Sequence, residues 1–345
     1  MKLRRVVVTG LGIVSPVGST VADAWANVRD GKSGILEVTD FDASTFATRI
    51  AGEVRGFDVE KYLSRKDQRK NDPFIHYGVG AAFDALDDSG LEVTDENSDR
   101  IGVAMGAGIG GIKYIEDNHD KYLAGGARKI SPFFIPGSII NMTSGQISIL
   151  KNLTGPNVSI VTACATSTHC IGFAGRSIAH GDAEVMLAGG SEYATTPLAM
   201  GGFCAAKAMS TRNDDPTAAS RPFDTDRDGF VLSNGAGCVV LEEYEHAKKR
   251  GAKIYGELIG FGMSGDAYHI TSPPEDGEGA RKCMAAALRD AEIDPSEVNY
   301  LNAHGTSTPV GDVGETVGIR RAFGAAADSM LVSSTKSVTG QRKEI

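Results

Sequence analysis

One cysteine in the sequence lies where a nucleophile is expected. Cys164 follows the apolar run Val158–Thr162, and an amphipathic helical pattern begins at Ser167 or Thr168. A strand-to-helix turn puts the thiol near a helix N-terminus, where the dipole and free N–H groups favour thiolate over thiol. The same N–H groups can hold an oxyanion that develops on an attacked carbonyl. The segment fits a buried, unreactive thiol equally well, and Cys170, two turns further on, fits core packing better.

Two further polar residues also end apolar runs. His304 follows Tyr300–Ala303 and opens a loop of glycine and hydroxyl residues, where it could donate a hydrogen bond or act as a base. Lys336 follows Met330–Ser333 and two more small residues. Taken singly, the histidine fits a structural role and the lysine a solvated surface. Because cysteine, histidine and lysine end three different predicted strands, we interpret them as one site.

Two patterns resemble other kinds of site without completing them. The sequence Gly106–Gly111 fits G-x-G-x-x-G after a strand, but no acidic residue follows near Ala124–Lys129 to bind a ribose. A glycine turn that allows close backbone approach is the better interpretation. A zinc site of Cys164, His169 and Cys170 lacks a second pair of ligands.

The segment from Asp224 to Gly229 copies the opening of a calcium-binding loop. Its twelfth position, which should be a bidentate glutamate, is Gly235, and its ninth is Leu232. We therefore expect a salt-bridged turn instead, formed by Arg221, Asp224, Arg227 and Asp228.

The elements that would position these residues alternate between strands and helices. We expect strands at Arg5–Thr9, Ile101–Met105, Val158–Thr162, Val185–Ala188, Val239–Leu241, Ile254–Ile259, Tyr300–Ala303 and Met330–Ser333, and helices at Val21–Arg29, Phe74–Ser89, Ser167–His180 and Gly279–Ala291. This order predicts an α/β fold with a largely parallel sheet covered on both faces. Arg5–Gly18 and Lys253–Gly265 share a strand and glycine-rich turn, which indicates two related halves joined near Lys248–Gly251.

Composition limits the class of protein. The chain has 345 residues, 41% of them hydrophobic, and a net charge of 35 − 44 = −9, which argues against disorder and against nucleic-acid binding. Its 43 glycines have no collagen period. We find no apolar run long enough to cross a membrane and no signal-peptide cleavage site, and five cysteines are an odd number at irregular spacing. We therefore expect a cytoplasmic protein.

Several separate motifs, in order along the chain, resemble one family. They are Arg4–Gly12, Asn141-Met142, Thr162–Thr166, Arg221–Asp224, Arg227–Phe230, Asp266–Pro273 and Ser333–Gly340. Together they resemble the β-ketoacyl-acyl-carrier-protein synthases of the elongating KAS II type, which belong to the thiolase-like condensing enzymes. The resemblance implies a thiolase-like fold of two related βαβαβ-type halves in an α/β/α/β/α arrangement, with the second half incomplete. It places the nucleophile half at residues 1–250 and the half with the histidine and lysine at residues 251–345.

The resemblance also implies an activity and roles for single residues. The activity is the acyltransferase reaction of fatty-acid elongation: an acyl chain is loaded onto Cys164, and an enolate formed by decarboxylation of malonyl-carrier protein then attacks it. By resemblance His304 donates to the malonyl thioester, Lys336 supports the catalytic network, and Glu315 is the acid near it. Thr306 and Thr308 match hydroxyls that hold the phosphopantetheine arm, and Ile109, Phe134 and Phe203 match positions along the acyl chain. No cofactor is implied.

The implied partners are acyl- and malonyl-carrier proteins and a second copy of the chain. Carrier proteins are acidic, so an acidic enzyme needs local basic charge to bind one. By resemblance this charge comes from Arg65, Lys66, Arg69, Lys70, Arg128, Lys129 and Lys207. Without the family, the basic run at 65–70 reads as an ordinary solvated helix face.

The match stops near the end of the sequence. The family has a second catalytic histidine where Gln341 stands, and the sequence ends four residues later at Ile345. We expect a residue so near a chain end to be poorly held, and condensation by the chain as written to be slow or absent. Ser233-Asn234 is a smaller departure, since the family usually has glycine and an acid there. Three alternatives stay open: a non-catalytic partner subunit, a thiol hydrolase, and a truncated chain that folds poorly.

Overall fold

A six-stranded mixed sheet forms the centre of the computed structural model, which describes residues 3–341. The order is β5 (Asn157–Val158), β4 (Ile101–Gly106), β6 (Val185–Glu192), β7 (Gly235–Glu243), β1 (Val6–Val14) and β8 (Gly256–Glu257). β4 runs parallel to β5 and β6, whereas the other three pairings are antiparallel. The prediction of a largely parallel sheet was therefore wrong. The connection from β6 to β7 returns to the same end of the sheet, which reverses the direction of β7.

Two long helices cover the faces of this sheet. α3 (Pro73–Ser89) packs on one face, and α7 (Thr166–His180) packs on the other. α3 begins at the Asp72 cap with proline in its first turn and ends at Gly90, whose φ of +62° suits glycine. In β1, a Cβ at Gly12 would collide with the Ala81 carbonyl of α3. Glycine there lets the helix lie directly on the strand.

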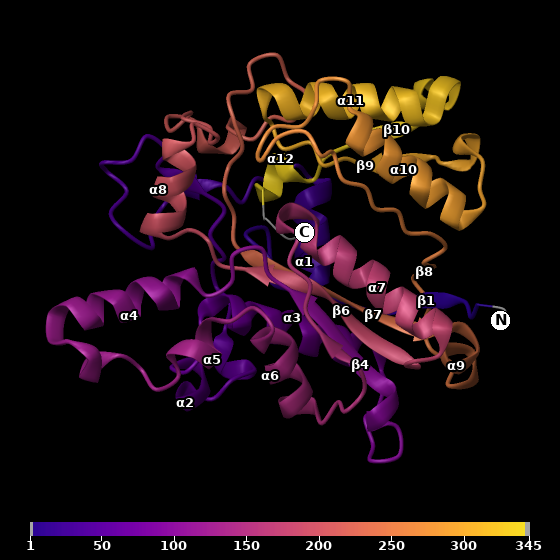
Figure 1. Ribbon diagram of the computed structural model, residues 1–345, viewed down its shortest axis with the longest axis horizontal. Helices are drawn as coiled ribbons and strands as arrows, with labels where there is room; N and C mark the ends of the chain where they lie inside the picture. The colour runs from indigo at the N-terminus through magenta and orange to yellow at the C-terminus, as the bar shows by residue number, and fades with distance from the viewer. Residues whose placement is uncertain (1–2, 342–345) are drawn as a thin grey trace.

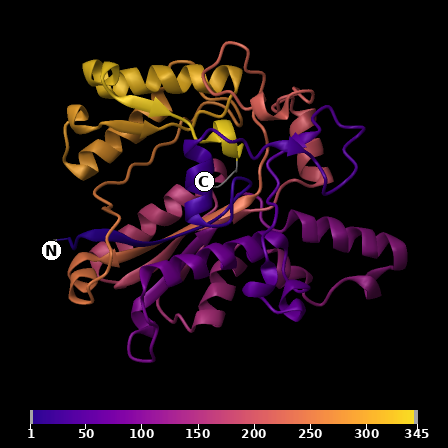
Figure 2. The same ribbon diagram turned by 180° about the vertical axis from the view of Figure 1, so that it is seen from behind.

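A smaller layer is built from the C-terminal part of the chain. β9 (Tyr300–Asn302) and β10 (Leu331–Ser333) form a parallel pair, and α10 (Glu278–Ala291) and α11 (Pro309–Phe323) pack around it through an apolar cluster. Figures 1 and 2 show this unit on the α7 side of the large sheet, with α3 on the opposite side. The layers follow the thiolase-like order. Within residues 3–341 the second sheet has two strands and the first has six, which agrees with the expected incomplete second half.

Shorter elements complete the described chain. The helices are α1 (Val21–Arg29), α2 (Arg65–Gln68), α4 (Ile112–Gly125), α5 (Phe134–Ser138), α6 (Met142–Lys151), α8 (Pro197–Ala205), α9 (Tyr244–Lys249) and α12 (Lys336–Thr339), and β2 (Leu36–Glu37) pairs with β3 (Ile50–Ala51). Within residues 3–341, no helix is both long and apolar enough to cross a bilayer.

The division of the chain into two halves near residue 250 stays a prediction. β8 belongs to the predicted second half, but it pairs with β1 of the first half.

The four helices expected from the sequence are present to within one residue at each end. The strand expected at Val158–Thr162 was wrong beyond Val158. The reason lies in two hydroxyl groups: the Met105 carbonyl at the end of β4 accepts hydrogen bonds from Ser144 and Ser159 side chains. Side chains thus occupy an acceptor that a longer β5 would have used, and the chain leaves the sheet before Cys164.

Candidate active site

Cys164 lies in a tight turn between the first sheet and α7. A single 3₁₀ turn, Ala163–Ala165, carries it, and the helix begins at Thr166, one residue before the earlier of the two predicted starts. Ala163 has a φ of +50°, a left-handed conformation that is uncommon for alanine. The Cys164 side chain is partly exposed, whereas Cys170 is buried in the core under α7 as expected. The geometry therefore presents one thiol at a helix N-terminus.

His304 and Glu315 form a second group at the carboxyl end of β9. The Glu315 carboxylate accepts hydrogen bonds from the backbone N–H groups of His304 (2.6 Å) and Gly305 (2.7 Å). Glu315 lies on α11, so the first turns of that helix hold the loop that carries the histidine. Glu315, the acid expected near the site, therefore acts as a hydrogen-bond acceptor that fixes the backbone of the loop.

Lys336 lies on the first turn of α12, which follows β10, and its side chain is buried. Desolvation by the surrounding protein, and then the Lys336 charge, lowers the pKa of the His304 imidazole to about 4. His304 as a whole residue is exposed, so only the direction of the shift, toward the neutral form, bears on the site. Burial raises the pKa of the Glu315 carboxyl, opposed by its two N–H donors and by Lys336. The structure therefore brings His304, Glu315 and Lys336 together, which are two of the three predicted strand-end residues and the acid that the resemblance implied.

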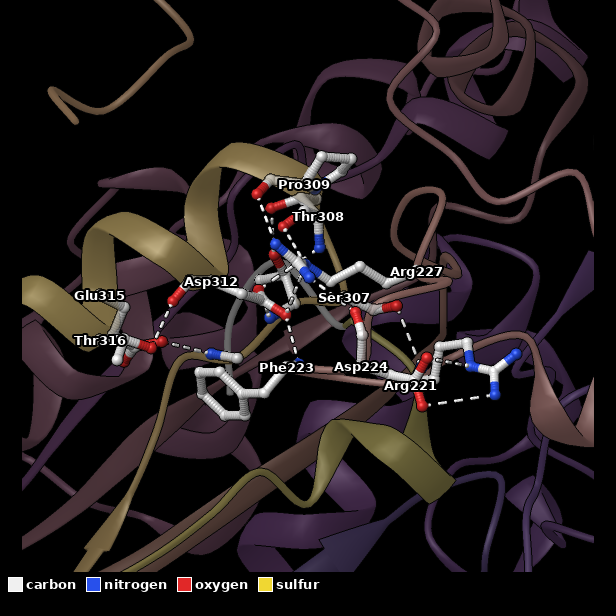
Figure 3. A network of polar contacts seen from close by, with 12 residues as sticks. Arg221, Phe223, Asp224, Arg227, Ser307, Thr308, Pro309, Asp312, Glu315 and Thr316 are labelled. Atoms are coloured by element: carbon white, nitrogen blue, oxygen red, sulfur yellow. Dashed lines mark hydrogen bonds and ion pairs between the residues drawn. The ribbon is translucent and has the colours of Figure 1, made fainter.

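A buried carboxylate fixes the hydroxyl-rich loop after His304. Asp312 accepts hydrogen bonds from the N–H groups of Thr306, Thr308 and Phe223 and lies 3.6 Å from the Arg227 guanidinium. Figure 3 shows these contacts, with Arg227 also donating to the Thr308 and Pro309 carbonyls. The Thr306 and Thr308 hydroxyl oxygens are consequently held 3.0 Å apart.

The role of Asp312 was missed at the level of sequence. An acidic residue at the start of a predicted helix, shortly after two threonines, is an available signal, because such residues cap loops and helix N-termini. The expected partner of Arg227 was also wrong. We predicted a turn closed by Arg221, Asp224, Arg227 and Asp228, and Arg221 does pair with Asp224. Arg227 pairs with the distant Asp312 instead, and Asp228 accepts from the Thr211 backbone.

A cavity of about 360 Å³ separates the nucleophile helix from the lysine helix. Its lining includes Ser167 and Ile171 of α7 on one side and Thr335 and Thr339 around Lys336 on the other. Most of the remaining lining is apolar and comes from β1, α1 and β7. α12 lies beside the N-terminal end of α7 in both views (Figures 1 and 2), and residues from both helix regions line this one cavity.

The three predicted acyl-chain residues are not equally close to one another. Ile109 and Phe203 pack against one apolar cluster, where Phe203 meets Phe230 edge-on at 5.3 Å. Phe134 lies on α5, and its side chain is half-buried. The structure therefore brings two of the three together.

The predicted basic residues lie on three segments of the described chain. Arg65 and Lys66 are on α2 with Arg69 and Lys70 just after it, Arg128 and Lys129 are in a 3₁₀ turn after α4, and Lys207 follows α8. The Tyr114 hydroxyl joins two of the segments, because it donates to the Arg69 carbonyl and contacts Ser131 at 3.0 Å. In the described chain, Arg65 and Lys70 form ion pairs with neighbouring acids, whereas Lys66, Arg69, Arg128 and Lys129 are in none of the ion pairs. Unpaired positive charge therefore remains on this face.

Gln341 is better held than its position suggested. Its backbone N–H donates to the Val231 carbonyl (2.7 Å), its carbonyl accepts from Ser233 (3.1 Å), and its side chain is buried. The expectation of a poorly held residue was wrong, because a bridge to Leu232 fixes it. Arg342–Ile345 lie outside the described residues.

Asn234 follows Ser233 and stands where the family usually has an acid. Its side chain accepts hydrogen bonds from the N–H groups of Ala194 and Thr195 and donates to the Thr195 hydroxyl, so it closes a buried network.

The backbone N–H groups of the glycine-rich loop at Gly106–Gly111 are bound by a side chain of the protein itself. Glu192 accepts hydrogen bonds from the Ile109 and Gly110 N–H groups, which occupies donors that a phosphate would need. A Cβ at Gly111 would collide with the backbone of Ser138. The interpretation as a turn of close backbone approach is confirmed.

Comparison with known proteins places this site in context. The chain matches the models for the β-ketoacyl synthase N-terminal domain over residues 3–247 and C-terminal domain over residues 255–343. It is 60% identical over 341 residues to 3-oxoacyl-[acyl-carrier-protein] synthase 2 of Vibrio cholerae and 58% identical over 340 residues to that of Coxiella burnetii, covering 99% of this chain and 82% of each relative. A β-ketoacyl synthase from Burkholderia phymatum (37% identity, 98% of this chain and 82% of that one) and a type II polyketide ketosynthase in complex with its acyl-carrier protein (34%, 99% and 82%) superpose with TM-scores of 0.90.

Proposed function

The chain belongs to the β-ketoacyl synthase family, and we propose that its acyltransferase reaction, the condensation that elongates fatty acids, runs through Cys164, His304 and Lys336. The first step loads the acyl chain. The Cys164 thiolate attacks the thioester of an acyl-carrier protein, the carbonyl oxygen becomes an oxyanion near the α7 N-terminus, and the carrier's thiol leaves. The product is a thioester on Cys164.

The second step forms the carbon–carbon bond. Malonyl-carrier protein loses carbon dioxide, and the resulting enolate attacks the acyl carbon on Cys164 to release a 3-oxoacyl product and regenerate the thiolate. A neutral His304 serves as a hydrogen-bond donor to the malonyl thioester oxygen, where negative charge develops. The observation that carries this role is the position of His304 at the end of β9, where Glu315 holds the backbone N–H groups of His304 and Gly305; the nearby Lys336 charge favours the neutral ring. The Asp312-held threonines line the approach and bind the phosphopantetheine arm.

The carrier protein binds the unpaired basic face. Lys66, Arg69, Arg128 and Lys129 supply positive charge that suits an acidic partner, and a structural relative was solved with its own acyl-carrier protein. We expect Lys129→Glu to slow loading by acyl-carrier protein several-fold, most strongly at low salt. Lys249→Glu on α9, on a different side of the molecule in Figure 1, is the matched control and should change nothing.

A second copy of the chain covers the edge of the large sheet. β5 is an edge strand with Val158 exposed, and the adjacent surface carries exposed Ile135, Ile149 and Val161. An open strand edge beside large apolar side chains is typical of a subunit interface. We propose a homodimer there, working in the cytoplasm, and sedimentation should give twice the chain mass.

Intact-mass analysis separates the two chemical steps. Long-chain acyl-carrier protein is added first and malonyl-carrier protein second, with Cys164→Ala as control. An acyl adduct that depends on Cys164 and then disappears into 3-oxoacyl product supports the whole reaction. An adduct that persists limits the chain to loading and would point to Gln341, which stands where the family has its second histidine, and no adduct refutes the assignment of Cys164.

A further inference from the structure

We propose that His169 is a positioning residue for the nucleophile, acting through the hydroxyl of Thr162. This inference rests on the proposed function, because it takes Cys164 as the group to be positioned. The sequence offered His169 only as part of an incomplete zinc site. The structure places it on the second turn of α7, facing back toward the turn that carries Cys164.

The turn needs external support. β5 ends at Val158, and Ala163 adopts a left-handed φ of +50°, which a non-glycine residue keeps only when its surroundings hold it. Thr162 is the last residue before this turn, and three hydrogen bonds converge on it. Its N–H donates to the Thr166 hydroxyl (2.9 Å), and its carbonyl accepts from the Ala165 N–H (3.1 Å).

The third hydrogen bond joins the Thr162 side chain to His169 on α7. The Thr162 hydroxyl oxygen lies 2.6 Å from Nδ1 of His169, which fixes the threonine side chain as well as its backbone. Within a single chain Thr162 is exposed and His169 is partly exposed, so this hydrogen bond is the contact that orients the threonine hydroxyl. The histidine therefore selects one orientation of the residue that leads into the nucleophile turn.

The ring of His169 is itself held by the second half of the chain. Phe261 meets it edge-on at 5.9 Å and also packs on Phe173 at 6.1 Å. A Cβ at Gly172 would lie 2.5 Å from the Phe261 ring, so glycine makes room for this contact. The Phe261 N–H donates to Asp290 of α10 (2.8 Å). A continuous set of contacts thus runs from α10 through Phe261 and His169 to the turn before Cys164.

Four substitutions separate the hydrogen bond from the packing. Thr162→Val and His169→Phe remove the hydrogen bond, and the latter keeps an aromatic ring against Phe261. Thr162→Ser keeps the hydroxyl, and His169→Asn keeps a polar atom where Nδ1 stands while losing the ring. A role limited to packing would make the asparagine variant worse than the phenylalanine variant, whereas positioning predicts the reverse order.

The assay measures the rate of acyl loading onto Cys164 from long-chain acyl-carrier protein and the rate of Cys164 alkylation by iodoacetamide, each corrected with Cys164→Ala. We expect Thr162→Val and His169→Phe to slow both rates about five- to tenfold at unchanged melting temperature. Thr162→Ser and His169→Asn should stay within about twofold of the parent rate. The double variant Thr162→Val with His169→Phe should be no slower than either single variant, because each substitution removes the same hydrogen bond.

Equal rates in all four variants, or multiplicative losses in the double variant, would overturn the proposal. Failure of the parent chain to take an acyl group would instead refute the proposed function, and the alkylation rates would still decide the role of His169. If His169→Phe melts early, the comparison between Thr162→Val and Thr162→Ser answers the same question.

Discussion

Replacing Asp312 by asparagine removes one negative charge from the loop that follows His304. One oxygen of Asp312 accepts from Thr306 and Thr308, and the other accepts from Phe223 at 2.8 Å and faces Arg227. An asparagine can keep the first oxygen. Its amide NH₂ would then stand where the second oxygen was, pointing donors at an N–H and a guanidinium.

The size of the effect follows from burial. The Asp312 side chain is 1% exposed and the Arg227 side chain 13%. Breaking one partner of a buried ion pair costs about 3–5 kcal/mol, and a buried N–H left without an acceptor costs about 1–3 kcal/mol. Because Arg227 keeps its three carbonyl acceptors, we expect a loss near the lower end, about 3 kcal/mol of unfolding free energy.

Urea unfolding at pH 7 measures this loss, with Asp224→Asn as the matched control. Asp224 also pairs with an arginine, but the two side chains are 40% and 28% exposed, so its loss should cost under about 1 kcal/mol. An Asp312→Asn variant within about 1 kcal/mol of the parent would refute the reasoning.

Three further outcomes follow from packing and charge. Gly172→Ala should destabilise the fold by about 1–3 kcal/mol because its methyl group meets a ring at 2.5 Å, whereas Gly202→Ala, in open space on α8, should be neutral or stabilising in the same thermal melts. Arg250→Met should cost about 3 kcal/mol in urea unfolding because Glu242, fully buried, loses its guanidinium partner, and a loss under about 1 kcal/mol would contradict this. The folded-state pKa of His304 lies near 4, below that of the free imidazole. The unfolded chain therefore takes up the proton first, and stability should fall as the pH drops from about 6.5 toward 4. His304→Asn should remove that part of the decline in unfolding free energy, and an unchanged pH dependence would count against the shift.

The local pattern of the chain identified four of the described α-helices, including the two that cover the large sheet, and the outline of the site. Periodicity and caps are properties of neighbouring residues, so the helix ends were predicted to within one residue, α3 and α7 among them. The idea that cysteine, histidine and lysine share a site also came from position, since each follows an apolar run. The family resemblance came from motifs, and the matches over residues 3–247 and 255–343 confirm it.

Contacts between distant residues had to come from the tertiary structure. β7 runs antiparallel because of where its connection re-enters the sheet, and β5 stops at Val158 because side-chain hydroxyls take the Met105 carbonyl. Arg227 forms its ion pair with Asp312 and not with Asp224 or Asp228, which are nearer in sequence, because the low dielectric of the buried site strengthens that pair. Thr162 and His169 are close in sequence, yet the ring that holds the histidine comes from Phe261. The sequence thus determined which reactive side chains the protein has and where its main helices begin. Which distant side chains pair depended on their burial and separation, and only the folded chain sets these.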